Sequence, residues 1–275
     1  MKKILVPTDF SLLSEHALEV AAKLASDFNA ELFIMHSLDL PVHLATKEQH
    51  DVPEVLFYMK MAQQKFQDFK DKPYLKNLAV NDIIEDATTS NAVQEAAIKH
   101  QIDLIVMGSG GASGIKEFII GSNTEKVVRN SEIPVLVIKE QNPDFKIERF
   151  VFACDFTPES YDPFVKAHEF AKILNAKIHY LFVNTPSDFH TTEEITHKMS
   201  AFIDRAQPSN FSLNIYNDKN VENGIVNFSK SVNADLIAVG THGRKGLAHI
   251  FNGSISEDLA NHALKPVLTF KIPTP

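Results

Sequence analysis

The chain has few features that would cross-link it or place it in a membrane. Among its 275 residues Cys154 is the only cysteine, so no disulfide can form within the chain. No apolar run is long enough to span a bilayer, and the start Met1-Lys2-Lys3 leads directly into a short strand pattern, without the apolar stretch of a signal peptide. We therefore expect a cytoplasmic protein that does not bind membranes.

Acidic residues outnumber basic ones, 35 to 27. The formal net charge is −8, which argues against broad binding of nucleic acids or anionic membranes. A G-x4-G-K-[ST] loop is also absent, which argues against a Walker-type NTPase. The content of hydrophobic residues, 44%, and of charged residues, 23%, is typical of a globular protein. We therefore expect no nucleic-acid partner and interpret the negative charge as serving solubility.

What the chain does contain is one glycine pattern that occurs twice. The pattern G-x2-G-x9-G-S is formed by Gly108, Gly111, Gly121 and Ser122, and again by Gly240, Gly243, Gly253 and Ser254. In each copy the first glycine closes an apolar run, residues 103–107 and 235–239, that is typical of a buried strand leading into a loop. Two matched loops indicate two matched sites.

The repeat extends beyond the glycines and indicates a duplicated domain. Residues 4–10 correspond to residues 150–156, and each segment ends in Asp-Phe. The chain is long enough for two compact domains, which we place at residues 1–139 and 146–275 with a linker at 140–145. The first copy is longer than the second, and we expect its additional residues within Leu40 to Asn77.

Each half alternates predicted strands with predicted helices, which indicates an α/β fold with a mainly parallel sheet. Ser11 is a start signal for the first helix, and Thr157 and Pro158 are start signals for the corresponding helix of the second half. Residues 134–138 and 266–270 are predicted as the last strand of each half. The apolar stripes of the two helices are formed by Leu13, Ala17, Val20, Ala21, Leu24 and Phe28, and by Phe164, Ala167, Phe170, Ala171 and Leu174.

The chemistry of the repeated pattern favours a phosphate ligand. The third glycine of each copy precedes Ser-x-x-Glu, the capping-box signature of a helix start. Such a start offers unpaired backbone N–H groups and the positive end of the helix dipole to an anion. Asp9 and Asp155 follow the first strand of each half and would lie across the same crevice, where a carboxylate accepts hydrogen bonds from a ribose or a base. Asp9 alone would equally serve as a cap of the helix that follows it.

Taken together, these residues resemble the universal stress protein family in a tandem form with two such domains. The resemblance covers residues 1–139 and 146–272, and in that family G-x2-G-x9-G-[ST] marks the members that bind ATP. It implies a five-stranded, mainly parallel sheet in each domain, with strand order 3-2-1-4-5 and helices on both faces. It also implies ATP, with Mg²⁺, as the ligand and pairing of the two last strands within the chain. A homodimer of the whole chain and an unidentified protein partner stay open.

The resemblance also implies the binding residues of both domains. In the first domain they are Pro7, Thr8, Asp9, Ser37, Met107, Gly108, Ser109, Gly111, Gly121, Ser122 and Asn123. In the second domain they are Asp155, Val183, Val239, Gly240, Thr241, Gly243, Gly253, Ser254 and Ile255. Three positions depart from the pattern: Ser37 stands where valine is common in the family, and Ala153-Cys154 replaces the Pro7-Thr8 of the first copy. We expect both clefts to accept nucleotide with unequal affinity.

No clear catalytic set accompanies these binding residues. His190 and His197 lie in a polar connection without the cysteine or acidic pattern of a metal site, so we assign no metal ligand. The favoured hypothesis is an ATP-binding regulatory protein of the stress response. The alternatives are a slow ATPase or adenylyl-transferring enzyme that uses Asp9 as a base, and a scaffold whose glycine loops stay empty. ATP turnover well above a slow background, abolished by Asp9→Asn, would favour the enzyme.

Overall fold

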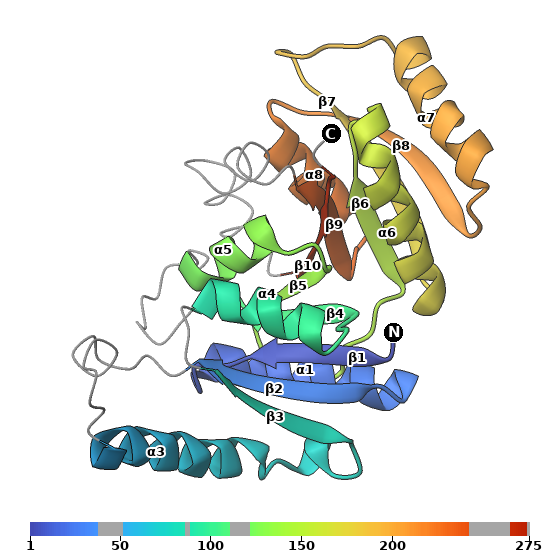
Figure 1. Cartoon of the computed structure of the whole chain (residues 1–275). Coiled ribbons are helices and arrows are strands. Elements are labelled where there is room, and N and C mark those ends of the chain that lie inside the picture. The colour runs from blue at the N-terminus through green and yellow to red at the C-terminus, as the bar shows by residue number, and fades with distance from the viewer. Residues whose placement is uncertain (38–51, 86–88, 111–121, 242–264, 274–275) are drawn as a thin grey trace.

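A single mixed sheet runs through both halves of the protein. The computed structural model describes residues 1–37, 52–85, 89–110, 122–241 and 265–273 (Figure 1). The strands follow the order β3-β2-β1-β4-β5-β10-β9-β6-β7-β8. Their bounds are β1 Lys3–Pro7, β2 Glu31–Ser37, β3 Val80–Glu85, β4 Leu104–Gly108, β5 Val135–Ile138, β6 Arg149–Ala153, β7 Lys177–Asn184, β8 Phe211–Asn217, β9 Leu236–Thr241 and β10 Val267–Lys271.

Each half of this sheet confirms the predicted strand order. Strands β1 to β5 follow the order 3-2-1-4-5, and strands β6 to β10 repeat it in the opposite direction along the sheet. All pairs within a half are parallel, as expected from strands that alternate with helices. The domain bounds that we predicted, 1–139 and 146–275, stay a prediction, because strand order alone does not fix them.

The two halves meet through their last strands, as the resemblance implied. β5 and β10 are antiparallel, with Leu136 opposite Leu268 and Val137 opposite Val267. Both leucines are fully buried. Each strand therefore covers the edge that the other would otherwise expose. Because the strands of one half are antiparallel to those of the other, the carboxyl ends of the two sets of strands point in opposite directions.

Helices cover both faces of the sheet. Their bounds are α1 Leu12–Phe28, α3 Val52–Lys70, α4 Thr89–Lys99, α5 Ser122–Asn130, α6 Tyr161–Ile173, α7 Thr192–Ala206 and α8 Val221–Ser231. Helices α1, α3, α6 and α7 contribute to one apolar cluster that continues across both halves. Helices α4 and α5 pack on the opposite face of the first half, and α8 packs on that face of the second half. No helix in the described part of the chain combines the length and apolarity of a membrane span.

The helix start signals are confirmed in both halves. The Ser11 hydroxyl accepts a hydrogen bond from the Ser14 N–H at the start of α1. In the second half Pro158–Ser160 form a 3₁₀ turn, closed by a bond of 2.9 Å from the Ser160 N–H to the Thr157 carbonyl. Thr157 and Pro158 therefore start this helical segment as the N-cap and the first residue of the 3₁₀ turn, and α6 continues from Tyr161.

The longer connection of the first copy lies between β2 and β3. Helix α3 there has 19 residues, whereas α7, in the same position of the second copy, has 15. Phe66 and Phe69 of α3 are buried in the apolar cluster. This helix therefore packs on the sheet through its carboxyl-terminal half.

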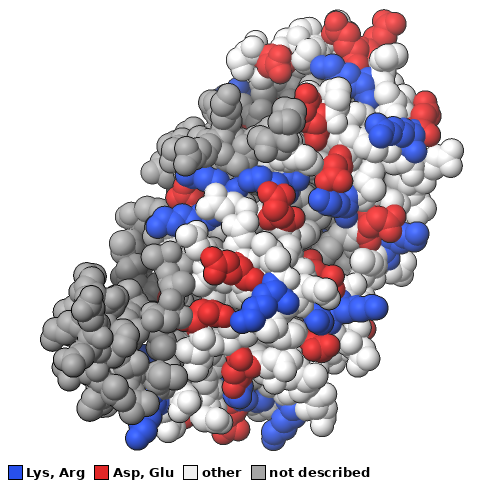
Figure 2. All heavy atoms as spheres, viewed as in Figure 1, with Lys and Arg blue, Asp and Glu red and all other residues white. Residues whose placement is uncertain are grey.

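Basic and acidic side chains are interspersed on the face shown in Figure 2. Ion pairs within one helix are formed by Lys23 with Asp27 at 2.5 Å and by Lys166 with Asp162 at 2.7 Å. Exposed pairs of this kind contribute little to stability.

Candidate functional site

The sheet has a topological switch point in each half. The chain leaves β1 toward β2 on one side and continues at β4 on the other, and β6, β7 and β9 repeat this arrangement. In open parallel sheets ligands bind at the carboxyl ends of the strands at such a point. The predicted site residues that the structure describes lie at or directly after these strand ends, apart from Ser122 and Asn123 at the start of α5.

In the second half the switch point holds a cavity of about 330 Å³. Four predicted site residues line it together: Asp155, Val183, Val239 and Gly240. Its wall is completed by Phe152, Ala153, Cys154, Thr157, Ser160, Pro163, Leu181, Phe182, Asp188, His190, Lys198, Val221, Ile225 and Ile272. The carboxyl ends of β6, β7 and β9, together with the side chains of α8, thus form a mostly apolar pocket with a few polar groups, as small-molecule sites usually are.

Gly240 shapes one side of this cavity. A Cβ at this position would lie 2.9 Å from Cδ1 and 3.0 Å from Cγ1 of Ile272. The backbone N–H of Ile272 also donates to the Thr241 carbonyl at 2.8 Å, which holds the chain after β10 against the end of β9. Glycine therefore allows the closing side chain of Ile272 to approach the strand end.

Asp155 and Asp9 stabilise the same kind of turn after the first strand. One oxygen of Asp155 accepts hydrogen bonds from the Thr157 N–H at 3.1 Å and from the Ser160 hydroxyl at 2.6 Å. Asp9 accepts a bond of 3.0 Å from the Ser11 N–H. The residue after each aspartate, Phe10 or Phe156, has a positive φ, 62° or 54°. Asp9 therefore supports the turn that precedes α1, while Ser11 itself caps the helix.

The structure explains why Cys154 can stand in the second copy where the first copy has Thr8. The Thr8 hydroxyl accepts a hydrogen bond of 2.9 Å from the Phe10 N–H, and the Cys154 sulfur accepts one of 3.2 Å from the Phe156 N–H. Burial raises the pKa of the Cys154 thiol, so the thiol stays protonated at neutral pH. The sulfur thus takes the place of the hydroxyl without becoming a reactive thiolate.

In the first half, Gly108 brings the end of β4 close to α1. A Cβ at Gly108 would lie 2.6 Å from the backbone oxygen of Leu13. The Gly108 carbonyl accepts a hydrogen bond of 2.9 Å from the buried Thr124 hydroxyl, which ties the strand end to the first turn of α5. The next residue, Ser109, donates its N–H to the Ile138 carbonyl at 2.8 Å. The end of β4 is therefore held between α1, α5 and β5.

The remaining predicted site residues of the first half lie along the same edge. Pro7 ends β1 and pairs with Met35, and Ser37 ends β2. Met107 is buried next to Gly108, and Asn123 is exposed in the first turn of α5. His36, beside Ser37, has its Nδ1 2.8 Å from the Thr8 carbonyl oxygen, so this histidine belongs to the support of the turn.

Most of the two glycine loops lies outside the described residues. This applies to Gly111, Gly121, Gly243, Gly253, Ser254 and Ile255, and for Ser122 the structure describes only its place at the start of α5. Their contact with phosphate stays a prediction.

Three residues that were not among the predicted site residues also line the cavity of the second half. Asp188 and His190 lie in the connection between β7 and α7, and Lys198 lies on α7. We had assigned no role to His190. The signal that was available is its position, because this connection follows the carboxyl end of a strand next to the switch point.

The strand order and the cleft at the switch point define the class of protein: a doubly wound α/β protein built from two similar units. The family model of the universal stress protein family matches residues 1–139 and 215–271, which is more than half of the chain. The chain therefore belongs to the universal stress protein family.

Known members of the family match one half or both halves of the chain. It is 29% identical over 140 residues to a universal stress protein of Methanocaldococcus jannaschii, covering 50% of this chain and 82% of the relative. A second protein of that organism is 30% identical over 156 residues, covering 51% of this chain and 96% of the relative. The crystal structure of a universal stress protein from Archaeoglobus fulgidus covers 98% of this chain and 96% of its own, with a TM-score of 0.72 and 20% identity. This last similarity shows the fold.

Proposed function

We propose that this protein binds an adenine nucleotide at the carboxyl edge of each half and acts as a regulatory protein. The observation that carries the proposal is the cavity of the second half, because it lies at the switch point and is lined by four of the residues expected to surround the nucleotide. ATP with Mg²⁺ is the proposed ligand, and the same backbone groups would also accept ADP or AMP.

The lining of the cavity suits a nucleoside. Val183, Val239 and Ile225 offer apolar surface to the faces of a base. Asp155 stands at the rim and retains a carboxylate oxygen as an acceptor for a base or a ribose hydroxyl. The rest of the second glycine pattern follows Thr241. We propose that it contacts the phosphates through backbone N–H groups.

The hydrogen bonds of the two aspartates favour nucleotide binding without rapid hydrolysis. Asp9 and Asp155 each hold the turn after the first strand through hydrogen bonds. A general base must accept a proton from an attacking group within hydrogen-bond reach, whereas one oxygen of each of these carboxylates already accepts hydrogen bonds from the turn. We therefore propose that nucleotide occupancy alters the surface that a partner meets at the carboxyl edge.

Filling the cavity tests this proposal in the second half. In Ala153→Phe the aromatic side chain would occupy the floor of the cavity, so we expect one of two ATP sites per chain to be lost in a calorimetric titration. Ala201→Phe makes the same chemical change on the exposed side of α7 and serves as the control. Thermal unfolding of both variants shows whether the fold is kept. Two unchanged sites in a folded Ala153→Phe protein would contradict the placement of the nucleotide.

A further inference from the structure

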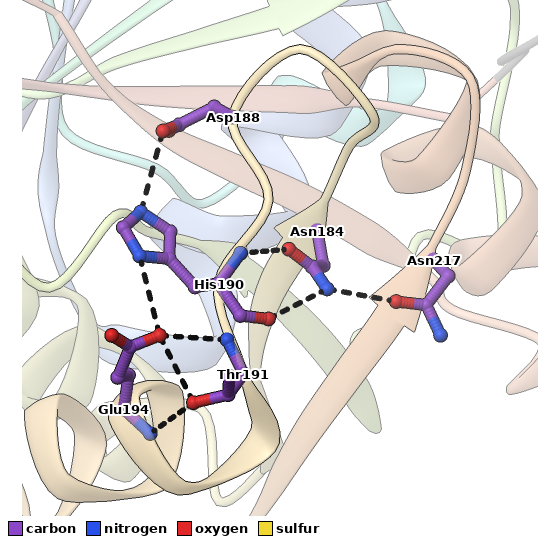
Figure 3. Close-up of polar contacts among 6 residues, drawn as sticks. All are labelled: Asn184, Asp188, His190, Thr191, Glu194 and Asn217. Carbon is purple, nitrogen blue, oxygen red and sulfur yellow. Dashed lines mark hydrogen bonds and ion pairs between the residues drawn. The ribbon is translucent and has the colours of Figure 1, made fainter.

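One wall of the cavity in the second half is formed by residues outside the glycine pattern. Asp188 and His190 precede α7, and Lys198 lies one turn beyond Glu194 on that helix. Nε2 of His190 lies 3.3 Å from a carboxylate oxygen of Asp188, and its Nδ1 lies 4.0 Å from Glu194 (Figure 3). These side chains bring polar groups to the β7 side of a cavity that is otherwise mostly apolar.

This wall is held in place by buried polar contacts. Asn184, buried at the end of β7, accepts a hydrogen bond of 3.0 Å from the His190 N–H and donates to the His190 carbonyl at 3.1 Å. The same amide donates to Asn217 at the end of β8 at 3.1 Å (Figure 3). Thr191 and Glu194 then form a reciprocal capping box that fixes the start of α7. The connection is therefore built to hold a defined position next to the cavity.

Lys198 is the cation of this wall. Its Nζ lies 6.0 Å from the centre of the buried Phe182 ring, and its charge helps to lower the pKa of the Glu194 carboxyl, one turn earlier on α7. An ammonium group is a hydrogen-bond donor and has no acceptor site. A ligand group that meets Lys198 must therefore offer an acceptor.

The surrounding charges favour a neutral acceptor over a phosphate. Asp155 and Asp188 line the same cavity, and Glu194 flanks His190. Three carboxylates against one ammonium group would repel a phosphate that carries further negative charge. A ring nitrogen or a carbonyl oxygen of a nucleobase accepts a hydrogen bond without that cost.

The layout of the sheet places the base at this wall. The second glycine pattern follows β9, while Lys198 and His190 belong to the connection after β7, and β6 separates the two strands. Neighbouring strands are about 4.8 Å apart, so the two ends of the cleft are separated by roughly 10 Å. A nucleotide with its phosphates at the β9 end would therefore direct the edge of its base toward the β7 end.

We propose that Lys198 binds the base in the second cleft by donating a hydrogen bond to an acceptor on the edge of a purine, beside the ring of His190. The inference rests on the proposed nucleotide binding. It adds a donor that the glycine pattern does not contain, and it applies to the second cleft alone.

The test compares two ligands and two lysine variants. Lys198→Met keeps the length of the side chain and removes the ammonium group, and Lys166→Met, on the exposed surface of α6, is the matched control. Each protein is titrated with Mg-ATP and with Mg-tripolyphosphate, which has no base. We expect Lys198→Met to weaken ATP at one of the two sites by about tenfold, as for a lost hydrogen bond to a charged group, and to leave tripolyphosphate unchanged. Lys166→Met should change neither ligand.

The outcomes separate this inference from the function on which it rests. If ATP binds the wild-type protein and Lys198→Met binds it equally well, Lys198 does not contact the base and the inference is overturned. An equal weakening of ATP and tripolyphosphate would place the lysine at the phosphates and also overturn it. If the wild-type protein does not bind ATP at all, the proposed function itself fails.

Discussion

Gly108→Ala is expected to lower the free energy of unfolding by roughly 2–3 kcal/mol, the upper part of the usual range for overpacking. The new Cβ would lie 2.6 Å from the carbonyl oxygen and 2.7 Å from the carbonyl carbon of Leu13. These are backbone atoms of α1, and they cannot yield by a side-chain rotation. Relief requires that the start of α1 move away from β4, which would also disturb the turn held by Asp9.

Gly240→Ala is the matched control for this prediction, because Gly240 occupies the same position of the repeat. There the Cβ would meet Cδ1 and Cγ1 of Ile272, the flexible end of a side chain, at 2.9 and 3.0 Å. We expect a loss of about 1 kcal/mol or less. Urea-induced unfolding of both variants gives the comparison. Equal losses would show that the approach of α1 to β4 does not distinguish the two halves.

Leu268→Ala is expected to destabilise the protein by about 3 kcal/mol, within the range for a large core side chain replaced by alanine. Leu268 lies opposite Leu136 where the two halves pair, and neither side chain is exposed. The apolar cluster on this face continues from one half to the other, so the cavity would weaken the contact between them.

Leu213→Ala on β8 provides the control, since Leu213 is 38% exposed on a strand at the outer edge of the sheet. Its loss should stay below about 1 kcal/mol. The double variant Leu136→Ala/Leu268→Ala should lose less than the sum of the single variants, because the two side chains share one cavity. Strict additivity would mean that the two leucines do not stabilise each other across the junction.

The sequence predicted the architecture because its signals are repeated and periodic. Buried strands read as continuous apolar runs, and residues 103–107 and 235–239 both became the core of a central strand, β4 and β9. The strand order and the antiparallel pairing of β5 with β10 came from the resemblance, and both are confirmed. A shared fold transfers such features even at low identity.

The site was predictable only where the second copy follows the pattern of the family. Asp155, Val183, Val239 and Gly240 were expected together and do line one cavity. The replacement of Thr8 by Cys154 gave no indication that a sulfur would accept the same backbone hydrogen bond as a hydroxyl. That equivalence depends on the positive φ of the following phenylalanine, which the residue types do not reveal.

The polar wall of the cavity in the second half was not predicted from the sequence. The histidines of this connection lack the cysteine or acidic pattern of a metal site, so Asp188, His190 and Lys198 were not among the predicted site residues. Their convergence depends on Asn184, which binds the backbone of His190 from the end of the strand. A contact between a strand end and a loop six residues further on leaves no periodic signal.

Calorimetric titration of nucleotide-stripped protein with Mg-ATP tests the central claim most directly, because it reports stoichiometry together with affinity. The two sites lie at the carboxyl ends of strands that point in opposite directions, so the sites should fill independently. We predict two sites per chain with unequal affinity, since the two clefts differ at Ser37 and Val183 and at Thr8 and Cys154. A titration without saturable binding would contradict the account and remove adenine nucleotides as the ligand.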